Sequence, residues 1–112
     1  MARIPLAIEI EREDHEEGVL LKIGGRVDKS TGGDFVAALR EAEESDAEAI
    51  LVDLSRVELM NYSGLTLLYE AHKRQLENGG RLRVVACSLQ VRNLFAMSGV
   101  YDRFMGDPAS PT

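Results

Sequence analysis

Two patterns of hydrophobic residues alternate along the chain, one typical of β-strands and one typical of α-helices. Alternating apolar and polar residues predict a strand over residues 4–12, and a short apolar run predicts a second strand over 19–23. The turn between them favours a β-hairpin. Residues 47–54 form a nearly continuous apolar run, which suits a strand buried on both faces, and residues 81–87 form the fourth predicted strand.

Three other segments carry apolar residues at the three- and four-residue spacing of a helix that buries one face. These predicted helices cover about residues 35–44, 63–78 and 88–99. Residues 24–35 are rich in Gly, Asp, Ser and Thr, which indicates a loop leading into the first helix. Residues 101–105 are predicted to be a short last strand or an extended tail. The expected apolar stripes of the second and third helices are Leu65, Leu68, Ala71 and Leu76, and Val91, Leu94, Phe95 and Ser98.

Start and stop signals flank these helices. Thr31 and Asp34 stand at the spacing of a capping box, with Asp in place of the usual Glu. Either Asn61 or Ser63 is suited to cap the second helix, and Ser88 is suited to cap the third. The glycines predicted to end the second and third helices are Gly79, Gly80 and Gly99.

The order of predicted elements is β-β-α-β-α-β-α. Strands that alternate with helices predict an α/β fold with a mostly parallel central sheet of four to five strands and helices packed on it. The length of 112 residues indicates one domain. We place this domain at residues 1–106 and predict a disordered tail over the polar, proline-containing residues 107–112.

The charge balance narrows the choice of partners. The formal net charge is −6, and acidic and basic residues are interspersed. Nucleic acids and anionic membranes need clustered Lys and Arg, so neither is expected as a direct partner. The one cysteine, Cys87, excludes an internal disulfide and fits a reducing compartment. No signal peptide or membrane-spanning run is recognised, so a cytoplasmic location is expected.

Ser63 is the most informative candidate for chemistry. A nucleophilic serine needs a base within hydrogen-bonding distance. His72 lies nine residues further along the same predicted helix, about half a turn around it and two and a half turns away, so it cannot serve Ser63. His15 lies in a predicted surface turn, and helix geometry does not exclude it as the base for Ser63. The sequence Asn-Tyr-Ser-Gly-Leu also lacks the first glycine of a nucleophile elbow.

Two other roles for Ser63 are compatible with each other. At a helix start, Ser63 can cap free backbone N–H groups. The same place suits a phosphoserine, because free N–H donors and the helix dipole favour an anion there. A phosphate would add about −1.5 to −2 units of charge. Gly64 would leave room for the active site of another protein.

Asp53 offers a rival interpretation. Asp53 and the buried run before it resemble the phosphoacceptor strand of response-regulator receivers. The acidic pair and the late lysine of that family are missing. A carboxylate that accepts from nearby backbone N–H groups is the plainer alternative. Nucleotide-binding glycine spacing and His/Cys clusters are also missing, so no cofactor, metal or catalytic residue is expected. Cys87, Phe95 and Met97 are expected inside, and His72 on a helix surface.

Residues 50–100, "ILVDLSRVELMNYSGLTLLYEAHKRQLENGGRLRVVACSLQVRNLFAMSGV", resemble the STAS domain, the fold of anti-sigma factor antagonists. The strongest signal is Ser63-Gly64-Leu65, followed in order by "GGRL", "VRNLF" and "SGV". The stretch "GGRVDKSTGGDFVAAL" is similar to the family's loop before its first helix. The resemblance covers roughly residues 6–105.

The resemblance implies a cytoplasmic, non-enzymatic protein that binds an anti-sigma factor with serine kinase activity and thereby frees a sigma factor. Phosphorylation of Ser63 would weaken this binding, and a metal-dependent serine phosphatase would reset it. ATP and magnesium would belong to the partner. A homodimer is compatible with the family. The implied partner-binding residues are Asp28, Lys29, Ser30, Asn61, Tyr62, Gly64 and Leu65, with Asp53 as a supporting strand-end acid.

The chain departs from the family pattern at two places. Asn61-Tyr62 stands where an Asp and a small hydroxyl residue are common, and Arg26-Val27 precedes Asp28 where an acid and a leucine are common. These changes lie on the implied binding surface. They either tune which kinase reaches Ser63 or indicate a constitutive STAS scaffold or sensory-assembly module without phosphorylation. An exposed Tyr62 would be an interface anchor; a Tyr62 packed on a neighbouring loop is the alternative.

Overall fold

The structure is a computed structural model that describes residues 7–105. Four strands form one sheet in the order β1-β2-β3-β4. β1 runs antiparallel to β2, whereas β2 and β3, and β3 and β4, run parallel. The predicted hairpin and the mostly parallel sheet are therefore confirmed. The strands are β1 (Ile8–His15), β2 (Gly18–Val27), β3 (Ala49–Met60) and β4 (Arg81–Cys87).

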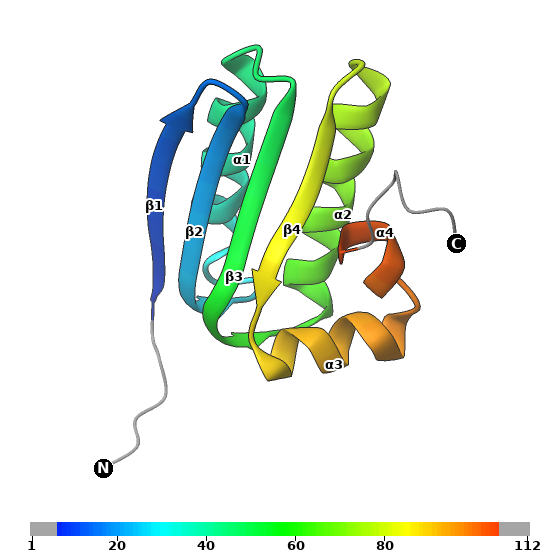
Figure 1. The fold of residues 1–112 in the computed structure, drawn as a ribbon. Helices are drawn as coiled ribbons and strands as arrows, with labels where there is room; N and C mark the ends of the chain where they lie inside the picture. The colour runs from blue at the N-terminus through cyan, green and yellow to red at the C-terminus, as the bar shows by residue number, and fades with distance from the viewer. Residues whose placement is uncertain (1–6, 106–112) are drawn as a thin grey trace.

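Four helices accompany the sheet (Figure 1). α1 and α2 lie on one face of the sheet, and α3 crosses the end at which β4 stops. α4 lies beside α2, on the β4 side of the molecule. In the described part of the chain, no helix covers the other face of the sheet. The helices are α1 (Gly32–Glu44), α2 (Tyr62–Glu77), α3 (Leu89–Ser98) and α4 (Tyr101–Met105).

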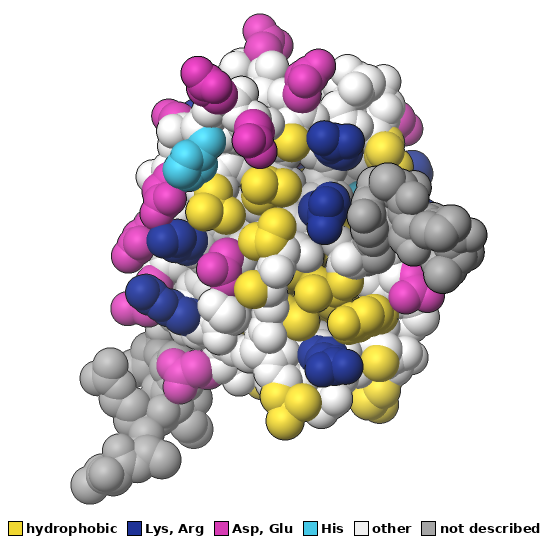
Figure 2. Space-filling view, in the orientation of Figure 1, with side chains coloured by type: hydrophobic (Ala, Val, Ile, Leu, Met, Phe, Trp, Pro, Cys, Tyr) yellow, Lys and Arg dark blue, Asp and Glu magenta, His cyan; other side chains and the backbone are white. Residues whose placement is uncertain are grey.

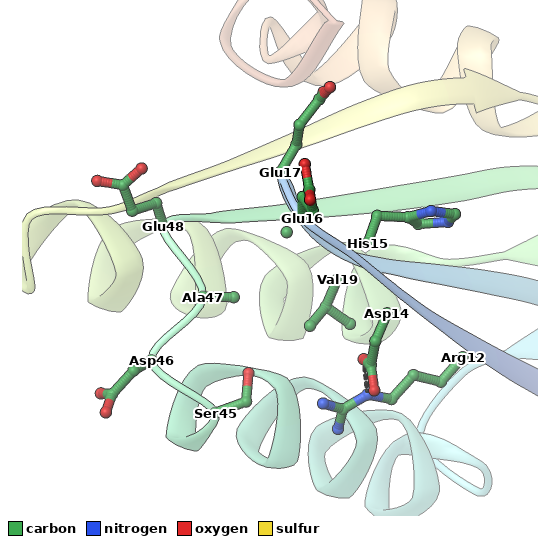
Figure 3. A pocket seen from close by; sticks show the side chains of 11 residues that line it. Arg12, Asp14, His15, Glu16, Glu17, Val19, Ser45, Asp46, Ala47 and Glu48 are labelled. Atoms are coloured by element: carbon green, nitrogen blue, oxygen red, sulfur yellow. Dashed lines mark hydrogen bonds and ion pairs between the residues drawn. The ribbon is translucent and has the colours of Figure 1, made fainter.

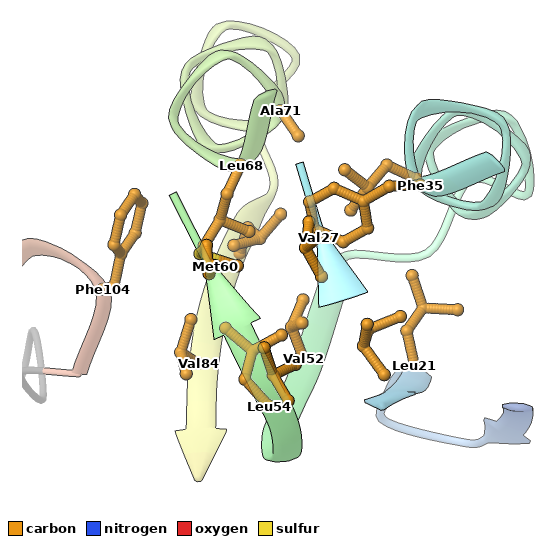
Figure 4. Close-up of a cluster of buried hydrophobic side chains, with 14 of the residues drawn as sticks. Leu21, Val27, Phe35, Val52, Leu54, Met60, Leu68, Ala71, Val84 and Phe104 are labelled. Carbon is orange, nitrogen blue, oxygen red and sulfur yellow. The ribbon is translucent and has the colours of Figure 1, made fainter. Parts of the chain in front are cut away.

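The core lies between the sheet and its two long helices. Every second residue of β2 points to the helices, as alternation along a strand requires. Phe35 of α1 and Leu68 of α2 are fully buried and pack against these strand residues. Figure 4 shows the labelled side chains of this cluster converging: Leu21, Val27, Phe35, Val52, Leu54, Met60, Leu68, Ala71, Val84 and Phe104.

Two strands are longer than the sequence predicts. β2 continues through residues 24–27, which were expected in a loop, and β3 continues through residues 55–60. The two extensions pair with each other up to Val27 and Met60, with register shifts on the way. Gly25 has a φ of +80°, a conformation that glycine adopts without strain. The glycines therefore mark a strand irregularity, and the prediction of a loop from residue 24 is wrong.

The C-terminal segment also differs from expectation. Residues 101–105 form helix α4, and the prediction of a strand or an extended tail is wrong. Phe104 is fully buried, with its ring centroid 5.1 Å from that of Phe95 and 5.4 Å from that of His72. This packing holds a helix that is too short to be stable alone. The predicted disordered tail, residues 107–112, lies outside the described residues.

Three helix positions are placed differently from the prediction. His72 is only 8% exposed and stacks near Tyr69, so it is not a surface histidine. Burial, reinforced by the charge of Arg103, lowers the pKa of His72. Leu76 and Met97, expected inside, are 53% and 80% exposed. His72 is buried because Phe104 of α4 packs against its ring, a contact that the pattern within α2 cannot predict.

The predicted end signals of α3 and the glycine after α2 are confirmed. Ser88 accepts a hydrogen bond from the N–H of Val91 at 3.4 Å and caps α3. Gly99 ends α3 with a φ of +72°, and Gly79 follows α2 with a φ of +83°. Cys87 ends β4 and is partly buried, as expected. Burial raises the pKa of its thiol.

Candidate partner-binding site

The candidate site forms where the carboxyl ends of β2 and β3 meet. Val27 and Met60 are paired at these ends, and the N–H of Asn61 donates to the carbonyl of Val27 at 3.4 Å. The loop of residues 28–31 continues from β2, and α2 begins directly after Asn61. The two segments implied by the family resemblance therefore lie side by side, joined by strand pairing rather than by sequence proximity.

Asn61 is the N-cap of α2. Its side-chain oxygen accepts from the N–H of Gly64 at 3.2 Å, and its carbonyl accepts from the N–H of Leu65 at 3.0 Å. Ser63 is consequently the second residue of the helix, and the cap alternative is resolved in favour of Asn61. Ser63 is exposed, and the N–H groups of Tyr62 and Ser63 lie in the first turn, where a helix offers no acceptor for them.

Asn61→Ala is expected to lower the free energy of unfolding by about 1 kcal/mol, because the N–H of Gly64 loses its acceptor. Urea unfolding followed by circular dichroism measures this change. Asn61→Asp is the matched control and should stay within about 0.5 kcal/mol of the wild type, since a carboxylate also caps. Equal stability of Asn61→Ala and the wild type would contradict the capping role.

Gly64 and Leu65 are not surface residues. Both are buried, and Leu65 belongs to the hydrophobic core. A Cβ atom on Gly64 would lie 2.6 Å from the carbonyl oxygen of Val27 and 2.8 Å from its side chain. The missing side chain of Gly64 is therefore required by internal packing, and our interpretation that it leaves room for a partner is wrong. These two residues position the first turn of α2.

The loop after β2 is held by the carboxylate of Asp28. This carboxylate accepts from the hydroxyl of Ser30 at 2.7 Å and from the N–H of Ser30 at 2.9 Å, and it forms an ion pair with Arg26. The hydrogen bond from the Ser30 hydroxyl is the main reason why the pKa of Asp28 is lowered. Asp28 thus shapes the loop, whereas Lys29 and Ser30 are exposed on it.

Thr31 has a different role from the predicted one. It precedes α1, but its side chain makes no capping bond, so the predicted capping box with Asp34 is wrong. Its hydroxyl accepts from the N–H of Asp28 at 3.0 Å and donates to the carbonyl of Arg26 at 2.8 Å. The hydroxyl is already used within the loop, so Thr31 closes the turn instead of capping the helix.

Asp53 does not lie at a strand end. It stands within β3, beside a register shift in the pairing with β4, and its carboxylate accepts from the N–H of Ser55 at 2.8 Å. This is the plainer of the two roles expected for it. Asp53 pairs with Lys22, which lies well before the end of β2, and it therefore stands apart from the start of α2.

Neither histidine can activate Ser63. His15 pairs with Gly18 at the opposite end of β2 from Val27. The nine residue steps from Gly18 to Val27 correspond to roughly 30 Å of strand. His72 lies on the buried side of α2. A serine hydrolase mechanism therefore has no base at this site.

Gln90 contributes to the structure of the site, and no sequence pattern predicts this role. Its side-chain amide accepts from the N–H of Met60 at 2.7 Å and donates to the carbonyl of Met60 at 2.8 Å. The pairing of β3 with β4 has already ended at Leu54. Gln90 thus satisfies the backbone of β3 next to Asn61 and fixes α3 against the site. Nothing in a helical glutamine near a cap predicts such a contact.

At the opposite end of the sheet lies a shallow hollow of about 380 Å³ (Figure 3). We call its carboxylates, which point outward around the rim, the acidic end. Arg12 is bound to one of them, Asp14, at 2.8 Å. Within residues 7–105 no group of three or more His, Cys, Asp or Glu side chains could hold a metal ion. The acidic end consists of Asp14, Glu16, Glu17, Asp46 and Glu48.

Comparison with known proteins agrees with this arrangement. The protein-family model described as "Mlab, STAS domain" matches residues 10–106. An anti-sigma F factor antagonist of Paenibacillus polymyxa is 26% identical over 95 residues, which cover 84% of this chain and 81% of that protein. Among the described residues, no helix is long and apolar enough to cross a membrane.

Solved structures share the fold. An anti-sigma factor antagonist from Mycobacterium paratuberculosis superposes with a TM-score of 0.78 at 26% identity, covering 94% of this chain and 86% of that one. The anti-sigma factor antagonist SpoIIAA in its unphosphorylated form gives a TM-score of 0.74 at 21% identity, covering 87% and 86%. The resemblance seen in the sequence is thereby confirmed, and the chain belongs to the STAS domain family.

Proposed function

We propose that this chain is an anti-sigma factor antagonist that binds its anti-sigma factor through the surface we call the α2 corner. This surface consists of the exposed residues at the helix start and on the adjoining loop. One observation carries the proposal: Ser63 stands exposed in the first turn of α2. The sequence resemblance implies that this serine corresponds to the family's phosphorylated serine. The residues of the α2 corner are Lys29, Ser30, Asn61, Tyr62 and Ser63.

The α2 corner is built for a rigid contact. Asn61 is fixed by its capping bond and by its bond to Val27, and the loop is fixed by the hydrogen bonds of Asp28. A preformed surface loses little conformational freedom on binding, which favours affinity. Tyr62 is 61% exposed, so the alternative in which it packs on a neighbouring loop does not hold. A large exposed ring at the centre of such a surface suits an interface anchor.

Phosphorylation of Ser63 is the proposed switch. The first turn of α2 contains no acidic residue, so a phosphate would meet free N–H groups without a carboxylate nearby on the helix. It would place about −1.5 to −2 units of charge in the middle of the α2 corner. A docked partner would then have to desolvate a dianion, which weakens binding. We propose that the anti-sigma factor is also the kinase that phosphorylates Ser63. A serine phosphatase would restore binding. The proposed location of the protein is the cytoplasm.

Ser63→Glu is expected to weaken binding to the cognate anti-sigma factor at least tenfold, because a fixed negative charge at the interface opposes docking. Ser63→Ala should bind within about threefold of the wild type. Titration calorimetry with the purified anti-sigma factor, with ATP omitted, measures both affinities. Ser55→Glu is the matched control, since it adds the same charge to an exposed residue on β3 outside the α2 corner.

Incubation with ATP, magnesium and the anti-sigma factor should add one phosphate to the wild type and none to Ser63→Ala, as read by intact mass spectrometry. Equal affinities of Ser63→Glu and the wild type would exclude the switch. Equal loss of affinity in Ser63→Glu and Ser55→Glu would show a general charge effect and would exclude the α2 corner as the contact surface.

A second function is favoured by Tyr62. Its exposed ring directly precedes Ser63, where it would stand in the way of a kinase active site that expects a small residue. In this alternative the chain is a constitutive STAS scaffold or sensory-assembly module, bound to its partner whatever the state of Ser63. The alternative predicts unchanged affinity for Ser63→Glu and no phosphate on the wild type, and Tyr62→Ser would then be needed before phosphorylation occurs.

A further inference from the structure

The face of the sheet that carries no helix has an ordered pattern of charge (Figure 2). Acidic side chains gather on its β1 side with basic side chains among them, hydrophobic side chains occupy its centre, and basic side chains lie over β4. Parallel strands usually have both faces covered, but here the parallel pairs β2–β3 and β3–β4 are covered on one face only. We call this surface the open face.

One row of side chains across the open face defines the pattern. The strand register places Glu13 beside Leu20, Leu20 beside Leu51, and Leu51 beside Arg83. The residues on either side of Leu51 and Arg83 in their strands are buried under the helices: Ile50, Val52, Leu82 and Val84. Side chains alternate along a strand, so the members of the row point to the open face. From β1 to β4 the row therefore reads acidic, apolar, apolar, basic.

The next row carries opposite charges at its centre instead of apolar side chains. Lys22 of β2 lies beside Asp53 of β3, so a cation and an anion flank the midline between the two central strands. Reversed end to end, Glu13 would face Arg83, Leu20 would face Leu51, and Lys22 would face Asp53. At the ends of the second row, Glu11 would face the small side chain of Ala86. Self-complementarity of this kind is what a two-fold symmetric contact between identical surfaces requires.

We propose that the open face binds a second copy of this chain, the two sheets stacking face to face about a two-fold axis parallel to the strands, between β2 and β3. This rotation brings β1 of one copy over β4 of the other. Stacked sheets lie about 10 Å apart with strands nearly aligned, a distance that Glu and Arg side chains can span. The proposal does not depend on phosphorylation or on an anti-sigma factor.

The charge pattern favours this arrangement over the other two-fold arrangement in which two open faces stack. An axis perpendicular to the strands would stack β1 on β1 and β4 on β4, which places like charges together. Within residues 7–105 neither Arg81 nor Arg83 has a carboxylate partner, so both are available to a second copy. Glu13 is bound to Lys22 at 2.8 Å and to His15 at 3.1 Å, but each carboxylate oxygen has a further acceptor site for an incoming guanidinium.

The size of the open face sets the strength of the contact. Four strands spaced about 4.8 Å apart and some six residues long give a contact on the order of 1,000 Å² in total, at the small end of specific interfaces. The dimer is therefore weak and reversible, with a Kd on the order of 100 µM. Because the axis runs along the strands, both α2 corners lie at the same end of the dimer and stay uncovered.

Sedimentation velocity from about 10 µM to about 1 mM tests the dimer. The wild type should pass from monomer to dimer over this range, and added salt should weaken the dimer. Two charge-reversed variants, Glu11→Lys/Glu13→Lys and Arg81→Glu/Arg83→Glu, should each raise the Kd more than tenfold. An equimolar mixture of the two should form a heterodimer with a Kd within about threefold of the wild-type value, because both contacts become attractive again.

Arg40→Glu/Lys73→Glu, on exposed helix surfaces remote from the open face, is the matched control and should dimerise like the wild type. Circular dichroism of each variant checks that it is folded, and Glu13→Lys alone or Arg83→Glu alone serves if the corresponding double variant is not. A monomer at about 1 mM would overturn the proposal and leave the open face to a different protein. A dimer unchanged in both charge-reversed variants, or a mixture that stays monomeric, would also overturn it.

Discussion

Gly64→Ala is expected to lower the free energy of unfolding by about 2 kcal/mol, although alanine is the better helix former. The added Cβ would lie 2.6 Å from the carbonyl oxygen of Val27 and 3.2 Å from the side chain of Met60. That carbonyl cannot easily retreat, because it also accepts from the N–H of Asn61. The first turn of α2 must therefore move away from the sheet, and Ser63 moves with it. Urea unfolding measures the loss as a lower midpoint.

Gly33→Ala provides the matched control with the opposite sign. Gly33 also lies in the first turn of a helix, α1, but a Cβ there would meet nothing within 4 Å. Alanine should stabilise the protein by about 0.5 kcal/mol, mainly by restricting the unfolded chain. If both variants were stabilised, the close approach of α2 to the end of β2 would be disproved.

Phe104→Ala is expected to lower the free energy of unfolding by about 3–5 kcal/mol, the range for removing a buried aromatic side chain. Its ring is fully buried and lies in edge or tilted contact with Phe95, His72 and Tyr69. Without this ring, α4 has five residues and no other fully buried side chain to hold it. We expect α4 to detach and His72 to become accessible, which amide hydrogen exchange would detect.

The control for this change is Leu76→Ala. Leu76 is also a large apolar residue, but it is 53% exposed at the far end of α2, so its removal should cost less than about 0.5 kcal/mol. Equal small losses in Phe104→Ala and Leu76→Ala would show that α4 is not part of the cooperative unit. A large loss in Leu76→Ala would instead indicate that this leucine is covered in solution.

The sequence predicted the elements whose pattern is local. Four strands and three helices were found because their apolar periods of two and 3.6 residues are carried within each segment. The caps at Ser88 and Gly99 were found for the same reason, since each depends on neighbours within three or four residues. The order of these elements predicted an α/β fold, and the resemblance around Ser63 and in the motifs after it implied the STAS family.

What escaped prediction depends on contacts between distant segments. The last residues of β2 look like a glycine-rich loop, and only pairing with β3 makes them a strand. His72 looks like a surface residue until α4 covers it. At the site, Ser63, Lys29 and Ser30 were identified as exposed candidates, but the inward position of Gly64 depends on Val27, which is far from it in the sequence. Contacts between distant segments produce no periodic pattern in the sequence.

The distance between the acidic end and the α2 corner gives the molecule an electric dipole moment along its strands. Carboxylates gather at one end, whereas the α2 corner, roughly 30 Å away, carries Lys29 and no acidic side chain. This dipole orients the chain in the field of a charged partner before contact. A phosphate on Ser63 would take the net charge from −6 to about −8 and would place the new charge at the formerly less negative end. The dipole would shrink, so phosphorylation would alter the rate of productive encounter as well as the docked complex.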